Sequence, residues 1–528
     1  MNNVWNICKI NLAETFGGGG TKRKKSLRSR GGAGTAIVFI LLAAYILFNF
    51  YNVGRMMAEQ YGAAGEERLM LYMAYFLSFI FVVSMSVFQM PAYLFGAKDY
   101  DFLMSMPIKS SQVVAGKLMP LYITNFAYSF VFTAGIFFAY GQYTGAGAAF
   151  YVLAVLGMLL APLAPMAVSA LLTWILERVA AVFRAKNIVR LITTFLMMIV
   201  LMGSVFFLTG TGIFDVESVK NTFTGVAGVI VTGEFFMRGL SGSALNMVWY
   251  ALISVAVFAV FVGVFAKSYR GISSARSTER RGEGYSAKDI KTSSVLMSLY
   301  KKDISFFFAN TNYALNSGMG LVLLTIAAIA AAVAGGDVFA GMGIPACAVV
   351  AAVLAFTLMM SQVCAPAVSL EAPYLWLLKS SPVRTMDILR AKLLSAMVIT
   401  FPLAAVDALV ASIALGASAA DTAVTVLYAF ALCAFVASFG LTVGLKHPKL
   451  DWTNDIVVIK QSSAIMITVL LGMLIAFVMI GAIMALSITL GAYLWITLAL
   501  SAVLILISAF MYSWIRKKGV SRFERLYR

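Results

Sequence analysis

The feature that most limits the fold of this chain is a series of apolar segments, each close to the length that crosses a lipid bilayer. A helix needs about 20 residues to cross about 30 Å of hydrocarbon. Charged residues make up only 12% of the 528-residue chain, about half the share of a soluble domain. We therefore predict an all-α integral membrane protein with about twelve spans. The predicted spans are 35–53, 71–95, 115–140, 147–176, 188–212, 244–266, 316–335, 341–366, 389–416, 422–445, 460–488 and 490–515.

The basic residues predict how these spans are oriented, because Lys and Arg in short loops are retained on the cytoplasmic side. If both termini are cytoplasmic, all of the 40 Lys and Arg residues lie inside except Arg55, Arg68, Lys220 and Arg238. The net charge of +18 is then explained by topology and requires no nucleic-acid partner. We predict a multi-pass protein of a bacterial plasma membrane, in contact with the lipid bilayer, with both termini cytoplasmic.

Two stretches of the sequence, 102–118 and 377–393, resemble each other at a constant shift of 275 positions without a gap. Each copy lies between the second and third span of a set of six. The aligned pairs are Leu103 with Leu378, Ser105 with Ser380, Pro107 with Pro382, Lys109 with Arg384, and Lys117 with Lys392. We infer an internal repeat, in which two six-span halves of the same membrane orientation are related by a pseudo-twofold axis.

This duplication predicts five regions along the chain. Residues 213–243 form the longest outer loop, and their apolar middle fits either a re-entrant helical hairpin or an ordinary loop. The regions are a cytoplasmic basic tail with a candidate interfacial helix (1–34), a first six-span half (35–266), a cytoplasmic linker with an interfacial segment (267–315), a second six-span half (316–515) and a basic cytoplasmic tail (516–528).

Patterns typical of catalytic or metal sites are missing from the sequence. His447 is the one histidine, and the four cysteines are scattered without metal-type spacing. Gly116-Lys117 is followed by Leu118 and lacks the first glycine of a phosphate-binding loop. We therefore expect that the chain is not an enzyme, and that it has no catalytic residue and no metal ligand.

Asp407 is the one acidic residue inside a predicted span. A charged side chain at the bilayer centre costs about 2.5–3.5 kcal/mol on insertion scales, so it should face protein or water. It is either a polar point in a transport path or an acid held between helices for structural reasons. Phe132 occupies the equivalent position of the first half, which favours the structural interpretation.

The repeated stretch predicts a short cytoplasmic helix that docks a partner protein. Ser105 and Ser380 lie two residues before a proline, where they would cap the helix that follows. Apolar side chains on a cytoplasmic protrusion indicate a docking site, and a plain loop is the alternative. The predicted docking residues are Phe102, Leu103, Ser105, Pro107, Ile108, Lys109, Leu378, Ser380, Pro382, Val383 and Arg384.

The residues from Phe102 to Ile108, and those from Leu377 to Val383, resemble the coupling helices of ABC-2 type ABC transporter permeases. The resemblance covers nearly the whole chain, in a double-length form with two fused halves. It implies an exporter of a hydrophobic or amphipathic substrate, such as a lipid, drug or peptide. It also implies that ATP and Mg²⁺ are bound by two copies of a separate ABC ATP-binding subunit. The alternatives are an ion-coupled secondary transporter with parallel repeats and a non-transporting membrane assembly protein.

Overall fold

The structure is a computed structural model in which two compact units are distinguished. Unit 1 comprises Met1–Val179 and Val200–Glu283, and unit 2 comprises Ala180–Ile199 and Gly284–Arg528. All regular structure in the described residues is helical. The described residues are 5–9, 30–95, 106–182, 186–210, 216–217, 220, 230–279, 293–335, 345–452 and 455–526.

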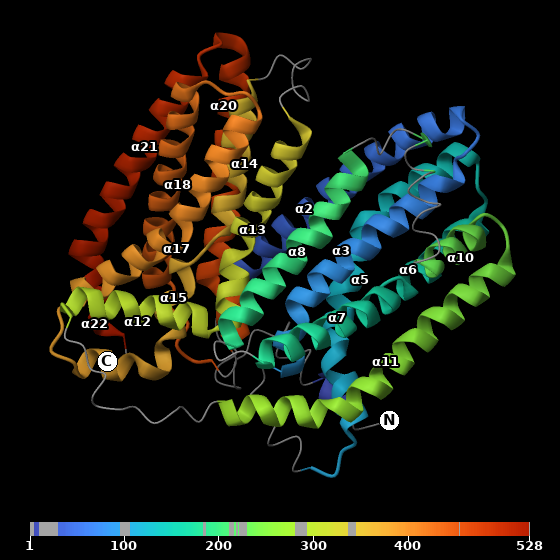
Figure 1. Cartoon of the computed structure of the whole chain (residues 1–528), viewed down its shortest axis with the longest axis horizontal. Coiled ribbons are helices and arrows are strands. Elements are labelled where there is room, and N and C mark those ends of the chain that lie inside the picture. The colour runs from blue at the N-terminus through green and yellow to red at the C-terminus, as the bar shows by residue number, and fades with distance from the viewer. Residues whose placement is uncertain are drawn as a thin grey trace. The chain divides into compact units, whose positions relative to one another are not determined.

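Unit 1 consists mainly of long helices (Figure 1). Their buried core is rich in aromatic side chains. The rings of Tyr75, Phe236 and Tyr250 lie 5.0–6.0 Å apart, and the Tyr75 hydroxyl donates to Thr232 Oγ1 at 3.0 Å. These contacts help to bury α10, the helix described within the predicted outer loop 213–243. The helices are α2 (Arg30–Ala63), α3 (Arg68–Phe95), α5 (Ser110–Thr144), α6 (Ala148–Leu160), α7 (Leu163–Val182), α10 (Val231–Leu240) and α11 (Ala244–Glu279).

Unit 2 is a bundle of long helices with shorter helices at one end. In Figure 1, α12 runs across that end of the bundle, near α15, α22 and the C-terminus. α12 falls within the residues 267–315 for which an interfacial segment is predicted. The helices are α12 (Val295–Ala309), α13 (Thr311–Ala334), α14 (Ala346–Met360), α15 (Cys364–Leu370), α16 (Leu375–Ser380), α17 (Thr385–Ala414), α18 (Ala419–Lys446), α19 (Asp455–Gln461), α20 (Ser463–Leu490), α21 (Tyr493–Trp514) and α22 (Val520–Arg525).

The helices confirm the predicted fold class. Ten helical segments of the described chain are long and apolar enough to cross a membrane. Of the two further predicted spans, 35–53 falls in α2, of 34 residues, and the described part of 188–212 falls in α8 (Lys186–Gly210), of 25 residues. Two predicted spans are interrupted: 147–176 divides into α6 and α7, and 341–366 divides into α14 and α15.

The two copies of the repeated stretch form the same backbone turn, each inside its own unit. The amides of Ile108 and Val383 donate to the carbonyl two residues before them, at 2.7 and 2.8 Å. Lys109 and Arg384 then precede α5 and α17 with nearly equal backbone angles, φ −68° and ψ 138° against φ −67° and ψ 128°. The aligned sequence positions therefore fold alike.

The short helix of the second copy precedes its proline rather than following it. α16 ends at Ser380, whose hydroxyl donates back to the carbonyl of Leu377 at 3.0 Å. The prediction that Ser380 caps a following helix is wrong, because a turn at Pro382 separates it from α17. Phe102, Leu103 and Ser105 lie outside the described residues.

Close helix packing in unit 2 depends on the spacing of Gly440 and Gly444, a small-xxx-small pattern that permits backbones to approach. Both glycines lie on α18 and face α15. A Cβ atom on Gly440 would lie 3.1 Å from the amide nitrogen of Ala365, and one on Gly444 would lie 2.6 Å from its carbonyl oxygen. Because backbone atoms cannot yield as a flexible side chain does, α18 requires glycine at position 444.

We predict that Gly444→Ala destabilises the protein by about 1–3 kcal/mol, the usual cost of overpacking. Gly481→Ala is the matched control, because nothing lies within 4 Å of a Cβ atom added to this glycine of α20. Thermal unfolding of the detergent-purified variants measures the difference. Equal unfolding temperatures for the two variants would contradict the close approach of α18 to α15.

Candidate functional site

An exposed apolar patch lies in the strap, which we define as residues 371–384 between α15 and α17. The patch consists of Tyr374, Trp376 and Leu377, which are all exposed, whereas Leu375 is fully buried. α16 therefore anchors the strap through one side and presents large apolar side chains on the other. An exposed group of this kind is typical of a surface that contacts another protein or a membrane.

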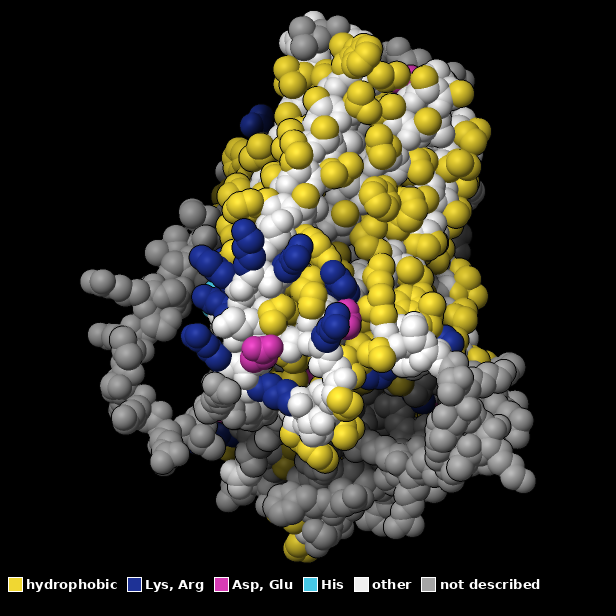
Figure 2. All heavy atoms as spheres, turned by 90° about the vertical axis from the view of Figure 1, so that its left-hand side faces the viewer, with side chains coloured by type: hydrophobic (Ala, Val, Ile, Leu, Met, Phe, Trp, Pro, Cys, Tyr) yellow, Lys and Arg dark blue, Asp and Glu magenta, His cyan; other side chains and the backbone are white. Residues whose placement is uncertain are grey.

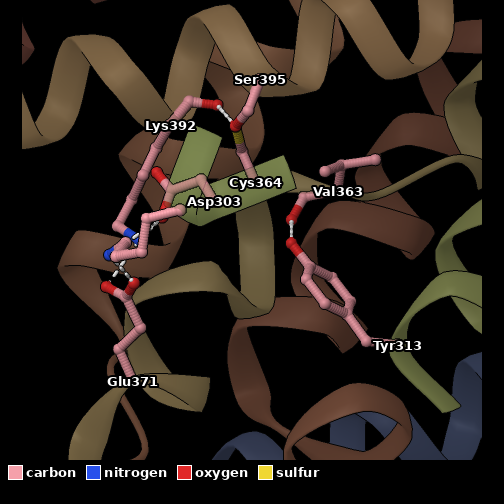
Figure 3. A network of polar contacts seen from close by, with 8 residues as sticks. Asp303, Tyr313, Val363, Cys364, Glu371, Lys392 and Ser395 are labelled. Atoms are coloured by element: carbon pink, nitrogen blue, oxygen red, sulfur yellow. Dashed lines mark hydrogen bonds and ion pairs between the residues drawn. The ribbon is translucent and has the colours of Figure 1, made fainter. Parts of the chain in front are cut away.

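The strap is joined to α12 and α17 by ion pairs among four charged side chains, and Figure 3 shows three of them, Asp303, Glu371 and Lys392, close together. Glu371 accepts ion pairs from Lys392 of α17, at 2.6 Å, and from Lys302 of α12. Asp303 of α12 lies 3.0 Å from the ammonium of Lys302 and 3.5 Å from that of Lys392. We call Lys302, Asp303, Glu371 and Lys392 the ion quartet. It joins the strap, α12 and the long helix α17.

Burial makes the ion quartet a strong constraint on structure. The side chains of Lys392 and Glu371 are only 3% and 5% exposed. Removing one partner from a buried ion pair leaves an uncompensated charge, which costs about 3–5 kcal/mol. Two cations and two anions balance, so the quartet needs no further ion. Within the described ranges, no group of His, Cys, Asp or Glu side chains is suited to hold a metal ion.

Next to the quartet, the backbone between α14 and α15 leaves the helix, and side chains of α13 bind its free carbonyl groups. The hydroxyl of Tyr313 donates to the carbonyl of Val363 at 2.5 Å (Figure 3). The hydroxyl of Ser317 donates to that of Gln362 at 3.1 Å. Buried backbone groups must be paired, so these two bonds stabilise the break that turns the chain toward the strap.

Two other segments of unit 2 hold the region of the strap. The indole of Trp452 donates to the carbonyl of Ser369 at 2.8 Å, and the amide of Lys449 donates to the hydroxyl of Ser369 at 3.0 Å. Partial burial lowers the pKa of the Lys449 ammonium. At the C-terminus, the Lys379 ammonium donates to the carbonyl groups of Glu524, at 3.0 Å, and of Leu526. The strap is thus fixed on several sides while its apolar patch stays open.

The sequence-predicted docking residues divide into exposed and half-buried positions. Ile108, Leu378 and Val383 are half-buried, so they mainly pack against their own unit. The residues at the surface are Pro107, Lys109, Ser380, Pro382 and Arg384. The largest exposed apolar side chains of the strap, Tyr374 and Trp376, lie just before the repeated positions and were not predicted. Aligning the two copies could not identify these residues. The signal in the sequence is the run of large apolar residues around Leu375, which is too short to bury all of them.

Asp407 lies on α17 away from the ion quartet. Its carboxylate accepts a hydrogen bond of 2.8 Å from the Thr325 hydroxyl of α13. The residue is 5% exposed, so the prediction that it faces protein is consistent with its position. The structure gives it one hydrogen-bond partner and joins it to no other acid among the described residues.

Comparison with known proteins identifies a family for nearly the whole chain. A family model described as "Membrane protein of 12 TMs" matches residues 35–513. No curated protein and no solved structure matches the chain. The match therefore indicates the number of spans but does not indicate an activity.

The resemblance to ABC-2 permeases is wrong at the level of the family. The matching family is that of twelve-span membrane proteins, and no ABC-2 family model matches. The motifs that carried the resemblance are short and lie around a proline, from Phe102 to Ile108 and from Leu377 to Val383. In the part of these stretches that the structure describes, residues 106–109 and 381–384 form a turn before a long helix.

We predict that Glu371→Gln destabilises the protein by about 3–5 kcal/mol, because Lys392 then remains buried without its nearest anion. Glu371→Gln combined with Lys392→Met should recover much of this loss, since Lys302 and Asp303 still pair. Arg390→Gln removes an exposed pair with Asp387 and should cost less than about 1 kcal/mol. Thermal unfolding of the purified variants measures their order of stability. A double variant that is less stable than Glu371→Gln alone would contradict the pairing of Glu371 with Lys392.

Proposed function

The chain belongs to the family of membrane proteins with twelve transmembrane spans, and we propose that it is the membrane subunit of a transport system powered by a separate cytosolic protein. The energy source would be ATP, bound with Mg²⁺ and hydrolysed by that partner. The observation that carries this proposal is the exposed apolar patch of the strap, Tyr374, Trp376 and Leu377, fixed to α12 and α17 by the ion quartet.

The patch suits a protein partner because it contains large aromatic side chains and has cations at its border. Large aromatic side chains dominate the binding energy of many protein interfaces. Exposed Lys379 and Arg384 border the patch, so the partner would be apolar at its centre and acidic at its rim. The repeated turn before α5 offers a second site, one for each half of the chain.

The ion quartet supports transmission of force from the strap to the membrane-spanning helices. A partner that displaces the strap moves Glu371, and Glu371 is paired with Lys392 on α17. Because a buried pair resists separation, α17 would follow the strap rather than stay behind. A loosely attached loop lacks this property.

The charge distribution supports a cytosolic position for the strap. In Figure 2, Lys and Arg side chains gather below the broad apolar wall of unit 2, and basic residues are retained on the cytoplasmic side. Both termini would then be cytoplasmic, in a bacterial plasma membrane. The spans contain few charges, which favours outward transport of a hydrophobic or amphipathic substrate, such as a lipid, drug or peptide.

The test is the ATP hydrolysis that co-purifies with the tagged chain. We predict that Trp376→Ser with Leu377→Ser lowers this activity by about tenfold or more, because aromatic anchors of an interface are worth about 2 kcal/mol or more. Trp495→Ser is the matched control: Trp495 is 70% exposed against 68% for Trp376, but it lies at the opposite end of α21 from the basic residues. The yield of monodisperse protein shows that each variant folds.

Either of two results would refute the docking role. One is wild-type protein that carries no ATP hydrolysis above the background of a mock purification. The other is a Trp376→Ser, Leu377→Ser variant that retains as much activity as the Trp495→Ser control.

Asp407 separates this proposal from proton-coupled transport. We predict that Asp407→Asn leaves the co-purifying ATP hydrolysis within about twofold of wild type, because the hydrogen bond from Thr325 persists with an amide oxygen. In membrane vesicles, uptake driven by an imposed pH gradient is the second measurement. Uptake that depends on the gradient and disappears with Asp407→Asn would favour a secondary transporter.

A further inference from the structure

Two cations lie over the same tryptophan ring at the end of α21, and neither is paired with an anion among the described residues. The ammonium of Lys446, the last residue of α18, lies 4.8 Å from the centroid of Trp514. The guanidinium carbon of Arg522, on α22, lies 5.6 Å from the same ring. Aromatic faces attract cations at these distances. The ring therefore draws two positive charges from different helices to one place.

Among the described residues, neither Lys446 nor Arg522 forms an ion pair. The nearest acid in sequence, Glu524, instead accepts a hydrogen bond from the Thr385 hydroxyl at 3.0 Å. Further exposed cations follow Trp514 in the sequence: Arg516, Lys517 and Lys518 lie between α21 and α22, and Arg525 is the last residue of α22. The place is thus strongly positive and open to solvent, which is the chemistry that binds an anion.

The ring also lies at the edge of an apolar wall. Val503, Leu506 and Phe510 are exposed and follow each other at helical spacing on α21. Trp514 comes four residues after Phe510 and therefore continues the same side of the helix. Figure 2 shows the basic side chains directly below this apolar wall. A ligand for the place would have an anionic group at one end and apolar chains at the other.

We propose that Lys446, Trp514 and Arg522 form a binding site for the phosphodiester headgroup of an anionic phospholipid. Its acyl chains lie along Val503, Leu506 and Phe510. Trp is suited to this level of a membrane because its ring is partly apolar and partly polar. A free phosphate ion satisfies the cations but leaves the apolar wall unused, and an acidic protein would have to approach within the headgroup layer.

Occupancy of this site acts on the strap through α22. The segment that carries Arg522 also binds Lys379 through the carbonyl groups of Glu524 and Leu526. A phospholipid that bridges Lys446 and Arg522 holds α22 against α18, and so keeps the C-terminal residues on the strap. This inference does not depend on ATP hydrolysis or on a cytosolic partner.

The test is native mass spectrometry of the full-length chain in detergent, titrated with phosphatidylglycerol or with phosphatidylcholine of the same acyl chains. Wild-type protein should retain phosphatidylglycerol preferentially. Lys446→Gln with Arg522→Gln should weaken this binding by roughly tenfold or more, since each cation near a membrane surface contributes appreciably to attraction of anionic lipid. The matched control, Arg516→Gln with Lys518→Gln, removes the same charge at two exposed positions, whereas the cations described over Trp514 are those of Lys446 and Arg522. This control should weaken binding by less than about threefold.

Several outcomes would overturn the proposal. They are equal retention of the two lipids by wild type, equal losses in the two double variants, and displacement of the lipid by millimolar inorganic phosphate. The first leaves an acidic protein as the ligand of this surface, the second indicates diffuse attraction, and the third indicates a free-anion site. Trp514→Leu keeps both cations, so a loss of preference in this variant with unchanged elution and helical content supports the site even if the double variant misfolds.

Discussion

The ion quartet is the interaction on which the rest of unit 2 depends. Three of its four charged side chains, Asp303, Glu371 and Lys392, are largely removed from water, and they are stable there only because each lies within 3.5 Å of an opposite charge. This requirement fixes three elements together: α12, the strap and α17. The break between α14 and α15 is compatible with burial because Tyr313 and Ser317 bind its carbonyl groups. The apolar patch is exposed because Leu375, on the other side of α16, is anchored over this framework.

The fold could be predicted from the sequence because membrane helices are governed by one dominant constraint. A segment without water must pair its backbone internally, so apolar length alone identifies the helices. The same reasoning did not locate the interruptions at Ala161 and at residues 361–363. An apolar run can contain a short break when side chains of another helix form hydrogen bonds with the backbone at the break. At residues 361–363 these side chains are Tyr313 and Ser317, which lie far from the break in the sequence.

The candidate site was only partly predictable. The aligned pair of Lys117 and Lys392 showed that each half places a cation inside an apolar helix, and both are buried, at 2% and 3% exposure. The aligned positions did not show which anions pair with Lys392, because Asp303 and Glu371 come from segments outside the repeated stretch. The serine cap failed for a related reason: Ser380 is equally able to bind the helix before it, and the turn at Pro382 decides in favour of that helix.

The charge balance of the ion quartet has an electrical consequence. Moving one elementary charge across a membrane that carries 100 mV requires or releases about 2.3 kcal/mol. The quartet has two positive and two negative side chains, so its displacement as a body along the membrane normal transfers no net charge through the field. When the strap, α12 and α17 shift together, the ion quartet therefore adds no voltage dependence of its own to the movement.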